Sequence, residues 1–413
     1  MISPDIKILA KKLSIEFGFK NSTLNPLTIY FFKRYYHSIC QNDHPKTLKF
    51  LRIIFKLDKK LALYLTAQML FLKGKFRLSL HYLNQLLSLD SQHTSSIYLK
   101  VKCLESLNQK NEAVHELIRC TNISRRKKTW LIWANIITTQ QEFSIYQKHW
   151  LKKNDATNDW DLINYLITAA LRTKQYDQAL DILEQTYQKI KSYQIQIKVS
   201  SNFSPIHQTN AELALSQIDK ILKKNQIEFF LISGTLLGLI RENKILGHDK
   251  DLDIGIWDHH EIEEIKTLIE RSGTFEILPI RSPKVLRVRH FSSVCIDIFI
   301  HECQEGKILH GGVKSVWENS SFDLMPAEFL NGSYLIPQNY DLYLSENYGD
   351  DWKIPKIEFD SSIDTPNIKI TNIYEMIAYC YQKLFISHAK NDQKLCAMYL
   401  SQIEYYKQQL LLK

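Results

Sequence analysis

Three aspartates occupy alternate positions, Asp249, Asp251 and Asp253, in the segment HDKDLDIGI at 248–256. Because side chains of a β-strand alternate between its faces, a strand here would direct all three carboxylates to one face. Like charges held so close repel, and burial penalises each of them further. A divalent cation removes this conflict, and ligands that are all oxygens favour Mg²⁺ or Mn²⁺ over zinc. The segment therefore predicts a magnesium-dependent site that handles phosphate groups, against the alternative of a solvated acidic loop before an edge strand.

Two further features favour the metal site. Gly234 and Thr235 form a turn between a predicted strand and a short predicted helix, where backbone N–H groups can hold a phosphate. Asp297 is a lone acid in the apolar segment VCIDIFIH at 294–301, where a carboxylate is costly unless it is paired or binds metal. We expect Asp297 to complete the site, either as a metal ligand or as the base that accepts the proton of an attacking hydroxyl.

Other candidates near these acids are less specific. Arg287 and Arg289 alternate along a predicted strand, and together they would clamp a pyrophosphate or simply face solvent. A looser set of histidines and cysteines lacks the tight knuckle spacing of zinc sites, so we do not expect zinc at His290, Cys295, His301, Cys303 and His310.

The elements that position these residues follow from the hydrophobic pattern after residue 207. Amphipathic helices alternate there with short apolar strands, which predicts an α/β or α+β domain with a small mixed sheet. The expected helices are 211–224, 236–243 and 260–273, and the expected strands are 227–233, 252–257, 275–280, 285–291 and 294–301.

The first half of the chain is helical and repetitive. Four helix pairs can be aligned on Ser79, Ala113, Tyr146 and Ala179, which are 34, 33 and 33 residues apart. This period, with a small residue early in each second helix, is typical of tetratricopeptide repeats, which stack because each unit leaves an apolar face uncovered. The bulky tyrosine and the missing consensus proline leave a plain α-solenoid or an irregular bundle as the alternative. Either architecture is a docking or scaffold surface.

We place the domain boundary near 192–206, where a Ser-rich, Pro-containing stretch interrupts the helical pattern. The predicted domains are an all-α helical-repeat domain at 1–195 and a catalytic domain at 205–413 that ends in helices. Residues 1–200 carry 31 Lys and Arg against 15 Asp and Glu, a net charge of +16, whereas the rest carries −7. The basic half would attract an anionic partner such as a charged glycan or a membrane surface, or it is a solvated Lys-rich surface.

Several classes of protein are disfavoured by composition. No apolar run is long enough to cross a membrane, and the first residues lack the apolar core of a signal peptide. Seven scattered cysteines without paired spacing fit free thiols in a reducing compartment. The aromatic-rich segment at 29–38 and the basic run at 123–128 match no nucleic-acid module. We therefore expect a cytoplasmic protein, peripheral to the inner face of the membrane at most, that does not bind nucleic acid.

The ordered motifs resemble those of the LicD/fukutin family, a branch of the nucleotidyltransferase fold. The similarity lies in GTLLGLIRENKILGHDKDLDIGI at 234–256, in the Asp-Ile-Phe strand, and in FLNGSYLIPQNYDLYLSENYGDDWKIP at 329–355. It covers about 207–360 and leaves out the helical half. The resemblance implies a phosphotransferase that moves a phospho-alcohol, such as phosphocholine or ribitol phosphate, from a CDP-activated donor to a hydroxyl of a cell-surface glycan or lipid-linked saccharide.

The resemblance also implies roles for individual residues. Asp251 and Asp253 would be the main Mg²⁺ ligands, with Asp249 in support and Asp297 as the third acid. Gly234 and Thr235 would hold the donor phosphate, and further contacts to the donor or acceptor would come from Arg241, Tyr348, Gly349, Asp350 and Trp352. Lys250 departs from the family, which often has another acid there; on a strand it points away from the aspartates.

Two other functions remain open from the sequence. A nucleotidyltransferase that leaves an NMP group on a small acceptor would use the same carboxylates, because only the attacked phosphorus differs. A non-catalytic scaffold would use the repeat array and retain the acidic run as a relic, although burying unused charge is expensive.

Overall fold

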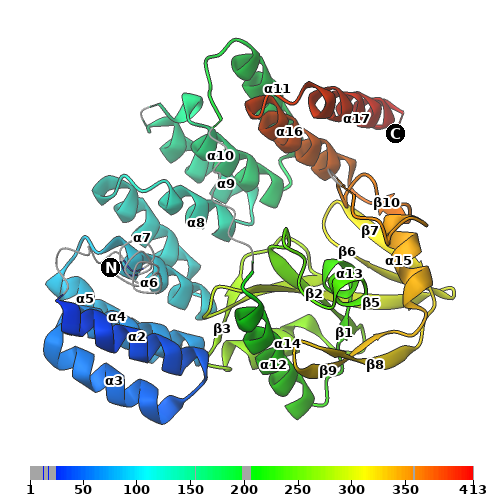
Figure 1. Cartoon of the computed structure of the whole chain (residues 1–413). Helices are drawn as coiled ribbons and strands as arrows, with labels where there is room; N and C mark the ends of the chain where they lie inside the picture. The colour runs from blue at the N-terminus through cyan, green and yellow to red at the C-terminus, as the bar shows by residue number, and fades with distance from the viewer. Residues whose placement is uncertain are drawn as a thin grey trace.

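The computed structural model describes residues 13, 17, 25–153, 155–197, 206–356 and 359–412. Figure 1 shows an arc of helices, blue through green, that lies beside a domain built on a twisted sheet, green through orange. The last helices, drawn in red, return to the end of the arc next to α11. The all-helical region followed by a mixed α/β domain confirms the predicted fold class.

From residue 25 onward the helical region contains two helices, α2 and α3, followed by the four predicted pairs, from α4–α5 to α10–α11. The bounds are α2 Pro26–Cys40, α3 His44–Leu57, α4 Lys59–Leu72, α5 Phe76–Leu89, α6 Thr94–Ser106, α7 Lys110–Ile123, α8 Lys128–Ile136, α9 Gln140–Leu151, a 3-10 turn at Ala156–Asn158, α10 Trp160–Arg172 and α11 Tyr176–Lys191.

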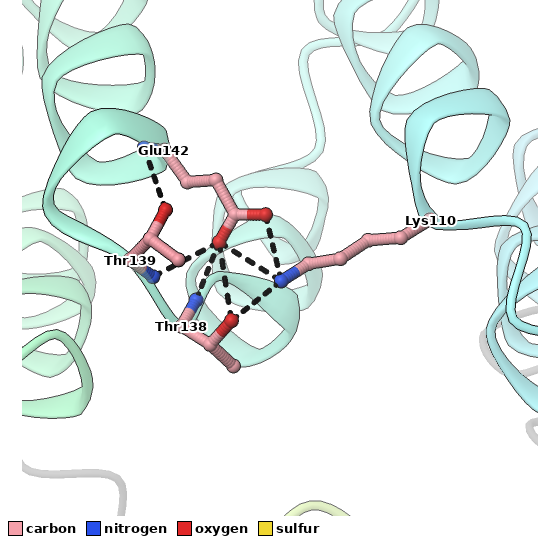
Figure 2. A network of polar contacts seen from close by, with 4 residues as sticks. All are labelled: Lys110, Thr138, Thr139 and Glu142. Carbon is pink, nitrogen blue, oxygen red and sulfur yellow. Dashed lines mark hydrogen bonds and ion pairs between the residues drawn. The ribbon is translucent and has the colours of Figure 1, made fainter.

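Polar side chains fix where individual helices begin and how neighbouring pairs meet. At the start of α9 the Thr139 hydroxyl accepts from the Glu142 backbone N–H, and the Glu142 carboxylate accepts from the Thr139 backbone N–H, which forms a capping box. Lys110 at the start of α7 reaches the same carboxylate, with its Nζ 2.7 Å from Oε1 of Glu142 (Figure 2). This ion pair joins the second helices of two successive repeats.

The four positions used to align the repeats are all fully buried, as stacking requires: Ser79, Ala113, Tyr146 and Ala179. The bulky Tyr146 is accommodated because its ring packs edge-on against Trp130 and Trp133 of the short helix α8. Its hydroxyl donates to the backbone carbonyl of Trp130 at 3.3 Å. The third repeat thus keeps the stacking geometry with an aromatic cluster in place of a small residue.

The sheet domain contains ten strands among the described residues, in the order β10-β7-β6-β5-β2-β1-β9-β8, with β4 paired to β5 and β3 at the edge beyond β4. The pairing is mixed, because β2 is parallel to β5 and β1 to β9, whereas the remaining pairs are antiparallel. The bounds are β1 Phe230–Leu231, β2 Asp251–Trp257, β3 Phe275–Leu278, β4 Val285–His290, β5 Cys295–Gln304, β6 Lys307–Gly311, β7 Ser315–Ser320, β8 Leu324–Phe329, β9 Gly332–Pro337 and β10 Ile368–Ile370.

Helices α12 (Gln208–Lys224), α13 (Ser233–Glu242), α14 (Ile262–Glu270) and α15 (Tyr340–Tyr348) surround this sheet and share one apolar core with it. The predicted helices and strands of this region are all present. The strand predicted at 227–233 is reduced to the two residues Phe230 and Leu231, because α13 begins at Ser233.

The C-terminal helices α16 (Ile373–Ala389) and α17 (Gln393–Leu411) belong to the core of the helical region. Tyr374 stacks on Tyr176 of α11 with ring centroids 4.9 Å apart, and Lys407 bonds Glu184 of α11 at 2.8 Å. The chain therefore leaves the repeat array, forms the sheet domain and returns to the array. The predicted boundary at 192–206 lies mostly outside the described residues and stays a prediction.

Within the described ranges, none of the helices combines the length and the apolar character that crossing a membrane requires.

Candidate functional site

Two parallel neighbouring strands bring the predicted acids together. In the β2–β5 register Asp253 lies beside Asp297, and Asp251 lies beside Cys295. Leu252, Ile254 and other apolar residues of β2 point to the opposite, fully buried face. The alternation of the sequence therefore fixes which face carries the acids, and Asp251, Asp253 and Asp297 share it.

Asp249 reaches this cluster from a loop, because β2 begins only at Asp251. Gly234 at the start of α13 lies next to it, since a Cβ at Gly234 would be 3.4 Å from both carboxylate oxygens of Asp249. Burial raises the pKa of Asp249 to about 6; nearby His248 opposes this rise and Asp251 adds to it. The expectation of three aspartates on one strand thus holds for two of them, and the third approaches from the side.

The acids interact strongly with one another. Burial, followed by the charges of Asp251 and Asp297, raises the pKa of Asp253 well above its usual value. Burial and Asp297 also raise the pKa of Asp251, whereas Arg287 lowers it. A backbone hydrogen bond from Gly234 is the contact that favours the charged form of Asp253. The Asp253 carboxylate is thus held in an unfavourable electrostatic position that a bound cation would relieve.

Arg287 of β4 pairs with two of these acids. Its Nε donates to Asp297 at 2.5 Å, and its Nη2 donates to Asp297 and, at 3.2 Å, to Asp251. Asp297 and Asp251 raise the pKa of the guanidinium in turn. Arg287, one of the two arginines predicted to clamp a pyrophosphate, is therefore paired with the carboxylates of the site.

The donor set fits a hard divalent cation in its chemistry, because the acids offer only oxygens from adjacent strands. In this structure, however, the carboxylates are not arranged as a metal site, because the described residues contain no group of three or more His, Cys, Asp or Glu side chains placed to hold a metal ion. Arg287 supplies positive charge to Asp251 and Asp297 in this structure.

The first turn of α13 positions β2. Gly234 and Thr235, predicted as a turn before the helix, are its second and third residues, because α13 begins at Ser233. The hydroxyl of Thr235 accepts a 2.7 Å hydrogen bond from the backbone N–H of Asp253, so this buried side chain fixes the strand that carries the acid. Ser233 has φ +48°, a left-handed conformation that is unfavourable for serine. Sequence reasoning missed Ser233, because nothing in its residue type marks a strained backbone.

A cavity of about 490 Å³ is lined by His248, the neighbour of Asp249 in the sequence, and by the predicted residues Arg241, Tyr348 and Trp352. Burial, and then the charges of Asp253 and Asp249, raise the pKa of Tyr348 well above its usual value. The sequence did not single out His248 or Lys356, which also lines the cavity.

The remaining predicted residues, Gly349 and Asp350, follow Tyr348 in the chain and are not among the residues that line the cavity. Gly349 ends α15 with φ +90°, a conformation that favours glycine, and Asp350 is exposed.

Arg289 lies on the same face of β4 as Arg287 but binds a different acid. Its Nη2 is 2.7 Å from Oε2 of Glu276 on β3. The two arginines therefore do not converge on one pyrophosphate position, because each is paired with a different protein carboxylate.

The loose set of histidines and cysteines does not form a metal centre in the described residues. His301 and His310 stack in the sheet with ring centroids 4.4 Å apart, and burial lowers the pKa of each, to about 3 for His301. His290 bonds the Ser292 hydroxyl at 2.7 Å. His301 and His310 are therefore neutral core residues, and His290 is a buried residue of β4.

Two family descriptions match parts of the chain. Residues 226–339 match "LicD/FKTN/FKRP, nucleotidyltransferase domain", and residues 52–120 match "Anaphase-promoting complex, cyclosome, subunit 3". The second match is to a tetratricopeptide-like region and confirms the repeat character of α4–α7.

Among curated proteins, the chain is similar to ribitol-5-phosphate transferase FKTN of Macaca fascicularis, at 28% identity over 178 residues, 40% of this chain and 38% of that protein. It is 31% identical to an uncharacterised protein of Rickettsia typhi over 148 residues, 33% of this chain and 42% of that protein. The chain thus spans about two fifths of the length of these relatives.

A solved structure, the lincosamide adenylyltransferase LnuA, aligns over 36% of this chain and 98% of its own, with 15% identity and a TM-score of 0.26. With so low a TM-score, this structure indicates neither the fold nor the function of the chain.

Proposed function

We propose that the protein transfers a phospho-alcohol from a CDP-activated donor to a glycan hydroxyl. The basis is the match of residues 226–339 to the LicD/FKTN/FKRP nucleotidyltransferase domain. The observation that carries the proposal is the parallel register that sets Asp253 beside Asp297, with Asp251 on the same face. A cavity of about 490 Å³, lined by His248 next to Asp249 in the sequence, offers space for a donor. Buried acids in such a position are expensive to keep without a use.

Asp251, Asp253 and Asp297 would hold a Mg²⁺ or Mn²⁺ ion, with Asp249 in support from its loop. Bound there, the ion would neutralise the donor phosphates and make the attacked phosphorus more electrophilic. Arg287 would leave Asp251 and Asp297, and its guanidinium is then close enough to pair with a donor phosphate. Of the two arginines predicted to clamp a pyrophosphate, only Arg287 would then contact the donor, because Arg289 stays paired with Glu276.

The donor would occupy the cavity of about 490 Å³. Arg241 and Lys356 offer positive charge to phosphate, and the ring faces of Tyr348 and Trp352 offer a wall for the base or sugar. The acceptor oxygen attacks the distal phosphorus, the bond from that phosphorus to the CMP oxygen breaks, and the hydroxyl proton passes to one of the carboxylates. CMP is the leaving group.

The acceptor in this proposal is an anionic glycan or a lipid-linked saccharide, which the basic helical region would attract. The net charge of +16 in residues 1–200 supports a negatively charged partner on this side of the molecule.

The test uses the purified full chain with a panel of CDP-alcohols and nucleoside triphosphates, with Mg²⁺ or with EDTA. We expect one CDP-alcohol to raise the thermal unfolding temperature only with Mg²⁺, and ³¹P NMR to show CMP once a glycan acceptor is added. The Asp251→Asn variant should lose both effects, whereas Asp258→Asn, an exposed acid after the end of β2, should keep them.

Other results point elsewhere. Stabilisation by a triphosphate, with pyrophosphate released, would indicate nucleotidyl transfer. No response to any nucleotide would favour the third function, a non-catalytic scaffold that acts through the helical array.

A further inference from the structure

Strand β4 directs two arginines at the face that carries the acids. In the β4–β5 register Arg287 lies beside Asp297 and Arg289 lies beside Cys295. Cys295 in turn lies beside Asp251 in the β2–β5 register. Because neighbouring strands are only about 4.8 Å apart, either arginine side chain is long enough to reach the acids. Arg287 does so, whereas the Arg289 guanidinium pairs with Glu276 on the other side of β4.

Glu276 accounts for this difference. It lies opposite Arg289 in the β3–β4 register and accepts from the Arg289 guanidinium at 2.7 Å. Burial alone would raise the pKa of the Glu276 carboxyl, but Lys102 and Arg289 outweigh burial and lower it to about 2. The side chain is charged at any working pH and is 15% exposed, so it holds Arg289 on the side away from Asp251.

The second partner of Glu276 comes from the helical region. Lys102 of α6 forms an ion pair with the other carboxylate oxygen. This contact lies in the interface where the helical arc meets β3, and it lines a cavity of about 340 Å³ there. Glu276 therefore links the repeat array to the strand that faces the acids.

Other contacts fix the whole β3–β4 hairpin to the helices. The backbone N–H of Gly273 donates to the Leu72 carbonyl of α4 at 2.8 Å, and the Tyr36 hydroxyl of α2 donates to the Phe291 carbonyl at 3.4 Å. In the hairpin loop Arg281 forms an ion pair with Glu375 of α16. The hairpin is thus held at its base by the first helices and at its loop by the C-terminal ones.

We propose that Glu276 is a positioning residue that keeps Arg289 away from the acidic site, so that Asp251, Asp253 and Asp297 face one displaceable arginine instead of two. Lys102 holds Glu276 in place, which gives the helical region a part in setting the cation affinity of the site. The inference rests on the proposed function, because it concerns the cation held by these acids. Without Glu276, Arg289 would turn toward Asp251 and compete with the cation.

The test measures Mn²⁺ binding to the full chain by electron paramagnetic resonance, without donor or acceptor. We expect Glu276→Gln to weaken Mn²⁺ binding about tenfold, because a second guanidinium then competes for the same carboxylates. The double variant Glu276→Gln with Arg289→Met should return to within about twofold of the wild type, because the competing arginine is gone.

The matched control is Lys110→Met, which breaks an ion pair of similar exposure inside the repeat array, away from the hairpin (Figure 2). This variant should bind Mn²⁺ as the wild type does. If Glu276→Gln binds Mn²⁺ normally, or if Arg289→Met fails to restore binding, Glu276 serves the fold alone and the inference is wrong.

Failure of the proposed function has a different signature. If the wild type itself binds no Mn²⁺, the proposal that these acids hold a divalent cation is wrong. The crystal structure of Glu276→Gln then decides the inference about Arg289. A guanidinium on Asp251 supports the positioning role, and one that stays beside β3 or turns to solvent overturns it.

Discussion

We expect replacement of the Asp253 carboxylate by a neutral side chain to stabilise the metal-free protein. Its carboxylate lies beside Asp297 in register, and both burial and the neighbouring acids disfavour its charge. Asparagine has nearly the same shape and carries no charge, and its amide can donate a hydrogen bond to a neighbouring carboxylate. In EDTA we therefore expect Asp253→Asn to be more stable than the wild type, although it removes a central residue of the proposed site.

The magnitude follows from the sheet geometry. Two unit charges about 5 Å apart, the spacing of neighbouring strands, repel by about 3 kcal/mol at an effective dielectric constant of about 20. Arg287 already compensates Asp297, which offsets roughly half of this repulsion. We expect the free energy of unfolding to rise by about 1–2 kcal/mol.

Native-state amide hydrogen exchange of β2 and β5 is the suitable assay, because a chain with several packed units need not unfold in one step. With Mg²⁺ at about 100 times its dissociation constant the order should reverse, because the wild type alone gains about 2.7 kcal/mol. Asp258→Asn, an exposed acid after the end of β2, should change neither value. A destabilised Asp253→Asn protein in EDTA would refute the electrostatic reasoning.

Two further predictions concern the core around β2. Gly255→Ala should cost about 1–3 kcal/mol in urea unfolding, because its Cβ would lie 2.4 Å from the Phe230 ring; Gly312→Ala, whose Cβ meets nothing within 4 Å, is the neutral control. Burial lowers the pKa of His301 to about 3 and that of His310 well below its usual value. Because the unfolded chain takes up these protons below about pH 6.5, the free energy of unfolding should fall by about 1 kcal/mol per histidine between pH 6.5 and 5.5, and His310→Gln should reduce that slope.

The acidic site could be predicted from the sequence as far as local pattern determines it. The alternation around Asp251 and Asp253 fixes their common face, and the lone acid Asp297 marks a second strand. The loop position of Asp249 was not predicted, because a period of two continues in the sequence beyond the point where pairing stops.

Ion pairs across the sheet depend on register, which a single sequence does not contain. Arg287 and Arg289 look equivalent along their strand, yet one binds Asp297 and the other binds Glu276. The difference arises from which residue β3 and β5 place opposite each arginine. The roles of Glu276 and Lys102 were missed for the same reason, since the two residues are 174 positions apart.

The repeat array was predictable because its period is long and regular, but its end was not. The apolar face of α11 is covered by α16, and no repeat period connects these two helices. Tertiary packing alone assigns the C-terminal helices to the array.

This return of the chain has a consequence for biosynthesis. Glu184 of α11 meets Tyr381 of α16, which is 197 residues later in the sequence. A ribosome that adds about 5–20 residues per second needs about 10–40 s to deliver that partner. During this interval the nascent array presents an unsealed apolar end while the sheet domain is still being made. Translation speed and chaperone supply should therefore affect the yield of this protein more than that of an array whose last helix follows directly.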